Sequence, residues 1–214
     1  MDKIRLGMVG GGEGAFIGEV HRISARMDER FILCAGALCS DPDRSLRSAL
    51  DLGITIDRSY SDYIEMAKSE SMRDDGINFV SIVTPNHLHH PVAKIFLESG
   101  INVICDKPMT MNSEEAKELI DISERSNLIF AVTYNYSGYP LIREAREIVK
   151  EGKLGKIRII QVEYIQDWLT KPIEKSGHKQ ASWRVDPSKS GPVSYTHLRA
   201  HETLRYLVCR LLLE

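Results

Sequence analysis

Short runs of apolar and β-branched residues alternate with stretches of helical periodicity along the N-terminal two thirds of the chain. Most strand-like runs end in a loop signal and lead into apolar residues spaced three or four positions apart. This order predicts βαβ units with a parallel sheet. The predicted strands are Ile4–Val9, Phe31–Leu38, Asn78–Val83, Asn102–Cys105 and Leu128–Thr133; the predicted helices are Ile17–Met27, one that starts at Ser40–Pro42, Asp62–Lys68, Pro91–Ser99 and Glu114–Ser126 capped by Ser113.

The pattern changes after Asn135. A helix is predicted over Leu141–Glu151 and a strand over Ile157–Tyr164, separated by a glycine turn. Polar and apolar residues alternate along that strand, which is typical of a sheet with one solvated face. We therefore expect an α/β protein with a doubly wound domain in residues 1–136 and the beginning of a second domain in residues 137–192.

The composition is that of a soluble globular protein, with 43% hydrophobic residues, 27% charged residues and a net charge of −2. This charge gives no case for nucleic acid or an anionic membrane as a partner. No apolar run approaches the roughly 20 residues of a bilayer span, and the start of the chain is strand-like rather than a signal peptide. The four cysteines lack C-x-x-C spacing, so neither zinc nor a disulfide framework is indicated. A cytoplasmic protein is expected.

The last 22 residues, Val193–Glu214, resemble the translation of a sequencing adapter. The adapter-like text predicts that the natural sequence stops near Gly191 and that the tail is not native. A genuine amphipathic C-terminal helix is the alternative, since LRYLVCRLLL contains helix formers at plausible spacing.

A glycine-rich loop between the first strand and the first helix is the first chemical signal. Such a turn lets backbone N–H groups approach a pyrophosphate at a helix N-terminus. The sequence fits G-x-G-x-x-A, and a second register replaces the alanine by a later glycine, Gly18. We expect the cofactor to contact Gly10, Gly12, Ala15, Phe16 and Ile17.

The end of the second strand, Leu38–Asp41, lacks a clear acidic reader of the ribose. Ser40 is the candidate contact there, and Asp41 can either cap the next helix or reach the ribose. Small residues with Arg44 nearby could admit a 2′-phosphate, which favours NADP over NAD.

Two further loops follow predicted strands, where ligands bind in open α/β sheets. The first carries Thr84, Pro85, Asn86 and His89. His87, His89 and His90 are read as cofactor-lining or helix-capping residues rather than metal ligands, because no carboxylate or cysteine completes a set. In the second loop, Asp106-Lys107-Pro108, a lysine is placed to polarise or protonate a substrate oxygen.

The segments VGGGEGAFIGEVH, TPNHLHHPVA, VICDKPMT and NYSGYP resemble the Gfo/Idh/MocA oxidoreductase family. The resemblance implies an N-terminal Rossmann domain followed by an α/β domain with a mostly antiparallel sheet. It also implies NAD(P), oxidation or reduction of a hydroxyl or keto group of a sugar, inositol or polyol, and a homo-oligomer formed through the C-terminal sheet.

The same resemblance implies roles for individual residues. Lys107 and Asp106 form the catalytic pair, with Asp106 in place of the more usual glutamate of an E-K-P motif. Cofactor contacts are implied for Thr84, Pro85, Asn86, His89, Asp106, Lys107 and Asn135; substrate contacts for Lys107, Tyr136, Trp183 and Arg184.

The family's D-x-G-x-H motif, which supplies an acid/base histidine, is not found in this sequence. The 214-residue chain alone is therefore expected to be inactive. The alternative function is a dinucleotide-binding regulatory or sensor protein without turnover; the intact Lys107 favours the enzyme.

Overall fold

The computed structural model describes residues 3–160, 177, 179–184, 186–191 and 211–212. The chain divides into two compact units, Met1–Thr133 and Tyr134–Glu214.

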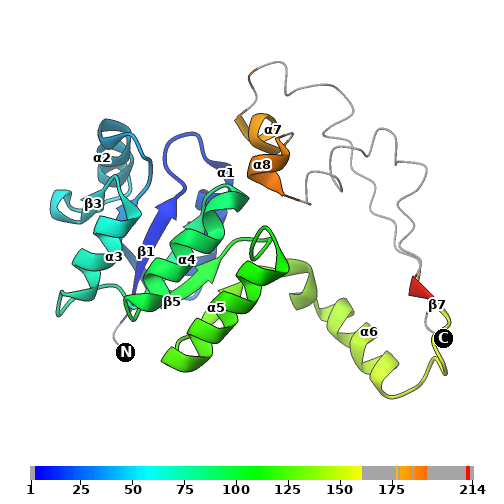
Figure 1. Ribbon diagram of the computed structural model, residues 1–214. Coiled ribbons are helices and arrows are strands. Elements are labelled where there is room, and N and C mark those ends of the chain that lie inside the picture. Colours follow the sequence, from blue (N-terminus) through cyan, green and yellow to red (C-terminus); the bar gives the residue numbers. More distant parts are fainter. Residues whose placement is uncertain (1–2, 161–176, 178, 185, 192–210, 213–214) are drawn as a thin grey trace. The chain divides into compact units, whose positions relative to one another are not determined.

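The first unit contains a six-stranded sheet with the order β3-β2-β1-β4-β5-β6, in which every pair is parallel (Figure 1). The predicted parallel α/β fold is confirmed. The strands are β1 (Ile4–Gly10), β2 (Phe31–Ala37), β3 (Ser59–Tyr60), β4 (Phe79–Val83), β5 (Asn102–Cys105) and β6 (Phe130–Val132).

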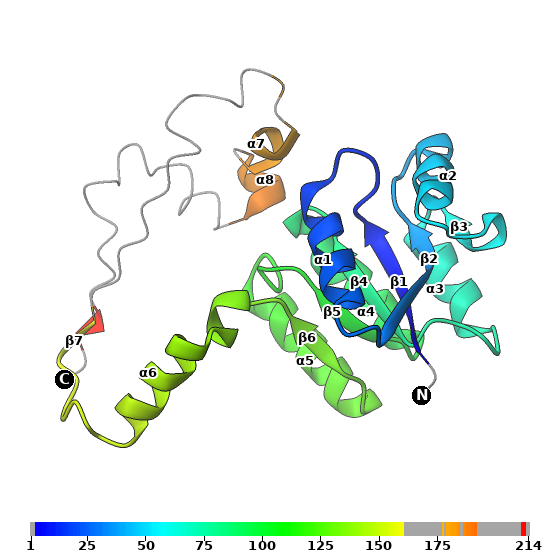
Figure 2. The ribbon, with the colours of Figure 1, turned by 180° about the vertical axis from the view of Figure 1, so that it is seen from behind.

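Helices cover both faces of this sheet. Figure 1 shows α3, α4 and α5 in front of the strands, and Figure 2 shows α1 on the opposite face. The helical elements are α1 (Phe16–Arg26), α2 (Pro42–Asp51), the 3₁₀ turn η1 (Ile56–Arg58), α3 (Tyr63–Ser71), the 3₁₀ turn η2 (Asn86–Leu88), α4 (His89–Glu98) and α5 (Ser113–Ser126).

Two apolar clusters lie on the two sides of the sheet. Val80 and Ile82 of β4 pack with residues of α3, α4 and α5, such as Phe96, whereas Val83 packs with Met8 and residues of α2. A parallel strand buried on both faces needs apolar residues at successive positions. This requirement explains why β1 and β4 are largely apolar.

Polar side chains determine where several helices begin. Asp41, Asp62 and Asn112 each accept a hydrogen bond from a first-turn amide of α2, α3 and α5. The predicted cap of α5, Ser113, was therefore wrong by one residue, because the longer amide of Asn112 reaches the Glu115 N–H at 2.9 Å. After α5, Asn127 adopts the left-handed conformation (φ 51°), and β6 begins later than the predicted Leu128.

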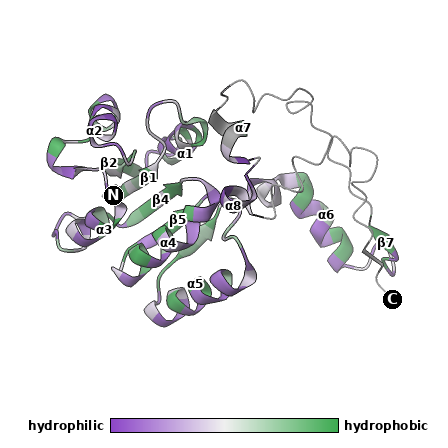
Figure 3. Ribbon diagram, turned by 45° about the horizontal axis from the view of Figure 1, so that its top comes forward, coloured by the Kyte–Doolittle hydropathy of each residue, from purple (hydrophilic) through white to green (hydrophobic). Residues whose placement is uncertain are grey.

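The second unit contains η3 (Asn135–Gly138), α6 (Pro140–Lys150), β7 (Ile159–Ile160), α7 (Lys179–Arg184), α8 (Pro187–Ser190) and β8 (Leu211–Leu212). Hydrophobic and hydrophilic residues alternate along α6 (Figure 3). Strands β7 and β8 pair antiparallel.

The expected mostly antiparallel sheet stays a prediction, because the described part of the second unit contributes only this two-residue pair. Of the predicted strand Ile157–Tyr164, residues 161–164 lie outside the described residues. So does most of the adapter-like segment, of which only Leu211–Leu212 is described. In the parts described, no helix is long and apolar enough to cross a membrane.

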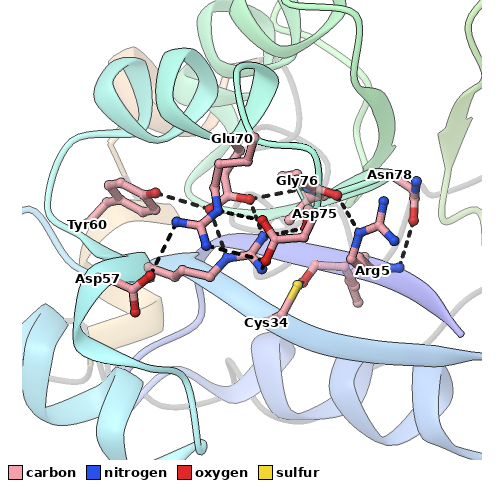
Figure 4. A network of polar contacts seen from close by, with 12 residues as sticks. Arg5, Cys34, Asp57, Tyr60, Glu70, Asp75, Gly76 and Asn78 are labelled. Atoms are coloured by element: carbon pink, nitrogen blue, oxygen red, sulfur yellow. Dashed lines mark hydrogen bonds and ion pairs between the residues drawn. The ribbon is translucent and has the colours of Figure 1, made fainter.

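A buried polar network joins η1, β3 and α3 (Figure 4). The Glu70 carboxylate is 1% exposed and accepts hydrogen bonds from Arg58 Nε (3.0 Å), Tyr60 Oη (3.0 Å) and the Ile77 amide (3.2 Å). Arg58 Nη2 also pairs with Glu70 Oε2. Burial and the neighbouring Glu70 carboxylate raise the pKa of Tyr60 to about 12. The network therefore fixes the connection from α3 into β4, the strand that carries part of the candidate site.

Replacing Glu70 by alanine should lower the free energy of unfolding by about 3–5 kcal/mol, because it removes the buried carboxylate that Arg58, Tyr60 and the Ile77 amide share. Asp75 lies 3.6 Å from Arg58 Nη1 but is exposed, so it does not replace Glu70. Urea denaturation followed by circular dichroism measures the change. Glu65→Ala is the matched control, since Glu65 is exposed on the same helix, and it should cost less than about 1 kcal/mol. Equal costs for the two variants would contradict a structural role for the network.

Candidate functional site

The candidate residues of the first unit lie in four loops, which follow β1, β2, β4 and β5. Parallel strands end at the same edge of a sheet, so these loops share one edge. The strand order reverses between β1 and β4, which are neighbours in the sheet. Ligands of doubly wound folds bind at such a switch point.

The loop after β1 is built from glycines that the local packing requires. Gly10 and Gly11 have φ of 80° and 76°, a region that side chains disfavour. A Cβ on Gly18 would lie 2.4 Å from the Gly11 Cα, so α1 can approach the loop only with glycine at that position. Gly18 thus supplies the close helix–strand contact that the first register assigned to Ala15. Arg22, on helix α1, donates a hydrogen bond from Nη1 to the Gly11 carbonyl at 2.8 Å.

Helix α1 begins without a side-chain cap. Ala15 is its N-cap residue and makes no side-chain hydrogen bond, unlike the caps of α2, α3 and α5. Its first-turn amides therefore have no capping side chain, which suits an anion at this helix end. Phe16 is 65% exposed, whereas Ile17 is partly buried against the apolar cluster that contains Met8 and Val83.

At the end of β2, the structure shows one of the two roles considered for Asp41, that of a helix cap. Its carboxylate accepts a hydrogen bond from the Arg44 amide at 2.8 Å and caps α2. The side chains of Ser40 and Arg44 are exposed beside it. Asp41 is the acidic residue nearest the end of β2, and its cap engages the carboxylate that could have read a ribose.

The loop after β4 contains two buried polar atoms without a hydrogen-bond partner in the described part of the chain, Thr84 Oγ1 and His87 Nδ1. A Cβ on Gly10 would lie 3.2 Å from Thr84 Cγ2, so the Thr84 side chain lies directly beside the glycine loop. An unpaired buried hydroxyl is costly unless a ligand completes it. Thr84 therefore fits a group with polar atoms held against the glycine loop.

The loop after β5 holds Asp106 firmly. The Asp106 amide donates to the Ile82 carbonyl at 2.9 Å, and Thr133 Oγ1 donates to Asp106 Oδ1 at 2.9 Å. His21 Nε2 lies 3.9 Å from the same oxygen. Burial raises the pKa of Asp106, but the interactions with His21, the Lys107 amide and Thr133 outweigh burial, and the net shift is downward. Asp106 is an anchored carboxylate, and the Lys107 side chain that follows it is exposed.

Two residues expected to line a cofactor are buried in the protein. Asn86 is 3% exposed and His89 is fully buried. The His89 ring lies between two carbonyl oxygens, with Nδ1 2.6 Å from Pro108 O and Nε2 3.0 Å from Thr84 O. Pro85 directly precedes Asn86, the first residue of η2. His89 therefore links the loops after β4 and β5.

The remaining candidates belong to the second unit. Asn135 and Tyr136 lie exposed in η3, where the rings of Tyr136 and Tyr139 pack edge to face with centroids 5.5 Å apart. In α7, the Arg184 guanidinium carbon lies 5.2 Å from the centre of the Trp183 ring, a cation–π contact. Aromatic side chains of this kind are suited to pack against a sugar ring.

Sequence reasoning missed two residues, Thr133 and Ser81, that hydrogen-bond to side chains of the site. Thr133 holds Asp106, and the Ser81 hydroxyl lies 2.8 Å from His21 Nδ1. Ser81 lies within β4 and Thr133 directly follows β6. Small polar residues in such apolar surroundings need a polar partner when buried. Among the described residues, no three His, Cys, Asp or Glu side chains gather in a way that could hold a metal ion.

Comparison with known proteins gives matches to two family models. Residues 4–134 match the NAD-binding Rossmann fold of the oxidoreductase family Gfo/Idh/MocA, and residues 142–202 match a Gfo/Idh/MocA C-terminal domain.

Individual relatives are consistent with the family models. The chain is 36% identical over 190 residues to the uncharacterized oxidoreductase YfiI of Bacillus subtilis, which covers 88% of this chain and 48% of the relative. It is 30% identical to levoglucosan dehydrogenase of Pseudarthrobacter phenanthrenivorans, with 97% and 52% covered. An inositol dehydrogenase homolog from Azotobacter vinelandii, crystallised with NADH and myo-inositol, matches with a TM-score of 0.78 and 38% identity over 87% of this chain and 48% of that one.

The chain thus spans about half the length of the curated relatives that it matches. The first family model alone accounts for most of the first unit, including all four site loops. The chain belongs to the Gfo/Idh/MocA family of oxidoreductases.

Proposed function

We propose that the protein is an NAD(P)-dependent dehydrogenase that oxidises or reduces a hydroxyl or keto group of a sugar, inositol or related polyol. One observation carries the proposal. The glycine loop, the unpaired Thr84 hydroxyl and the exposed Lys107 lie in loops at the carboxyl edge of the same sheet, at or beside the β1–β4 switch point.

The residues present fit a dinucleotide. The uncapped first turn of α1, with Gly10, Gly12, Ala15, Phe16 and Ile17, would receive the pyrophosphate, because backbone N–H groups there have no side-chain cap. Thr84 would hydrogen-bond the cofactor, and the rest of its loop, including Pro85, Asn86 and His89, would shape that side of the site. When bound, the nicotinamide supplies the hydride acceptor or donor.

Lys107 is the proposed acid/base or polarising group at the substrate oxygen. It is exposed one residue after Asp106, whose carboxylate is fixed by Thr133. A lysine on an anchored turn has fewer positions to sample than one on a free loop, which favours proton transfer at a defined atom. Within the Asp106–Lys107 pair, the proposed role of Asp106 is to hold the turn in place.

The substrate class rests on relatives. One is a levoglucosan dehydrogenase, and the structure of another contains myo-inositol. Both compounds are ring molecules with adjacent hydroxyl groups. Tyr136, Trp183 and Arg184 are proposed as further substrate contacts, and Asn135 as a cofactor contact, on the basis of the family resemblance.

The proposal also covers the cofactor preference, the oligomeric state and the cellular compartment. NADP is favoured over NAD, because Asp41 is engaged as a helix cap while Ser40 and Arg44 are exposed. A homo-oligomer formed through a C-terminal sheet follows from the resemblance. The free thiols of Cys34, Cys39 and Cys105 suit a reducing compartment such as the cytoplasm.

A regulatory or sensor protein that binds a dinucleotide without turnover is the second candidate. It requires the cofactor loops but gives no reason for an exposed lysine on an anchored turn. Incubating the whole protein with polyols and keto sugars while following nicotinamide absorbance separates the two candidates. The 214-residue chain alone is proposed to show no turnover, since its sequence contains no D-x-G-x-H motif.

Thr84→Val should weaken NAD(P)H binding about 10-fold, because it removes a hydrogen-bonding hydroxyl from an otherwise similar side chain. Fluorescence titration of the whole protein with NADH and NADPH measures the two affinities and the preference between them. The unfolding temperature should not fall, since the hydroxyl has no partner within the described protein. Unchanged affinity for both cofactors would remove Thr84 from the site.

Gly12→Val should abolish cofactor binding. A Cβ at this position would lie 2.8 Å from the Leu38 carbonyl oxygen, so the loop must move away from its pyrophosphate-binding path. Calorimetry checks the loss, and circular dichroism checks that the sheet persists. Unchanged calorimetric affinity in a folded variant would contradict the assignment of this loop.

Lys107→Ala should reduce turnover of the whole protein by roughly 10²–10⁴-fold, the usual effect of losing a positioned acid/base group. Steady-state kinetics with a substrate found in the polyol panel give the ratio. Lys117→Ala is the control, because Lys117 is exposed on helix α5. Retained activity in the Lys107 variant would mean that the lysine has no chemical role.

A further inference from the structure

His89 is the first residue of α4 and is fully buried, yet it touches the backbone of both loops that carry the candidate chemistry. Its ring nitrogens lie 2.6 Å from the Pro108 carbonyl oxygen and 3.0 Å from the Thr84 carbonyl oxygen. Pro108 directly follows Lys107. The ring is therefore the internal link between the lysine turn and the cofactor loop.

Both partners of the ring are carbonyl oxygens, which only accept hydrogen bonds. A neutral imidazole has one N–H, so it can donate to only one of them. Burial lowers the pKa of His89 below its ordinary value of 6.5, although both carbonyls and the Asp106 carboxylate act in the opposite direction and His87 acts with burial. Near neutral pH the ring is thus uncharged and must favour one of the two loops.

The geometry favours the lysine turn. The Nδ1 contact to Pro108 is shorter by 0.4 Å than the Nε2 contact to Thr84, from the distances of 2.6 Å and 3.0 Å. A close approach of nitrogen to oxygen requires a proton between them, whereas two lone pairs repel. The single proton therefore belongs on Nδ1.

Fewer hydrogen bonds hold Pro108 in place than hold Asp106. Asp106 is held by its amide on Ile82 and by Thr133 on its side chain. Proline has no N–H to donate, and in the described part of the chain the Pro108 carbonyl is hydrogen-bonded only through His89. Lys107 thus lies between one residue with several anchors and one residue with a single anchor.

We propose that His89 is a positioning residue, whose Nδ1–H donates to the Pro108 carbonyl and thereby fixes the turn that presents Lys107. The role of Lys107 in this statement rests on the proposed function; the hydrogen bond itself does not. The Thr84 carbonyl receives no proton from His89, and that loop stays free to adjust to a cofactor.

The first test reads the tautomer directly. Long-range ¹H–¹⁵N correlation spectra of the 214-residue chain at pH 7.5 should show a neutral His89 ring with its proton on Nδ1, assigned by loss of the signals in His89→Asn. A ring protonated on Nε2, or on both nitrogens, would overturn the proposal. This measurement needs neither cofactor nor turnover.

The second test uses two variants of similar size and polarity. The amide nitrogen of His89→Asn can take the place of Nδ1, and that of His89→Gln can take the place of Nε2. Amide hydrogen exchange at Lys107 should stay within about threefold of wild type in the Asn variant and accelerate about 10-fold or more in the Gln variant. Equal exchange in both folded variants would overturn the proposal; if either variant fails to fold, the tautomer decides.

In the whole protein, the same pair should separate kcat from KM. The Asn variant should keep kcat within about threefold, and the Gln variant should lose about 10-fold or more at nearly unchanged KM and NADH affinity, because only the presentation of Lys107 changes. Wild-type protein that neither binds NADH nor turns over would refute the proposed function while leaving the tautomer and exchange results intact. Equal kcat in the two variants of an active enzyme would refute the positioning role.

Discussion

The close contact between Gly11 and Gly18 is the constraint on which the site depends. A Cβ at Gly18 would lie 2.4 Å from the Gly11 Cα, so α1 rests directly against the loop that follows β1. With α1 this close, its uncapped first turn points to the same edge of the sheet as the ends of β4 and β5. Arg22 on the same helix reaches back to the Gly11 carbonyl and holds the loop in this path. A bulkier helix–loop contact would move the uncapped end of the helix away from Thr84.

The strands set the positions of the remaining groups by register. Ile82 of β4 pairs with Cys105 of β5, and Cys105 pairs with Val132 of β6. Asp106, one residue beyond the pair, meets both the Ile82 carbonyl and the Thr133 hydroxyl. Thr84, Asp106 and Lys107 lie only one or two positions after a strand end, so little loop flexibility separates them from the rigid sheet.

Much of this arrangement could be predicted from the sequence, because the alternation of apolar runs and helical periodicity is strong in the first unit. The glycine loop, Thr84 and Lys107 could be named as candidates because each follows a strand, at the edge where ligands of parallel α/β sheets bind. Gly18 could not be separated from Ala15 as the third position of the motif, since that choice depends on the distance between α1 and the loop. The same holds for the two-residue strand β3 and the turn η1, which are too short for a periodic signal.

Two supporting polar residues, Ser81 and Thr133, escaped prediction for a different reason. Ser81 of β4, Thr133 after β6 and His21 of α1 come from separate parts of the chain, and their interactions form only once the sheet has formed. Within the sequence, a serine in an apolar strand is indistinguishable from one that packs as a small residue. Its partner, His21, lies on the helix that crosses β4 on the opposite side of the sheet from α4. A buried polar side chain in a strand therefore indicates that a partner must exist, and the topology decides which helix can provide it. In this fold the partners converge beneath Asp106, so the sheet interior, and not the loops alone, determines how the turn that carries Lys107 is held.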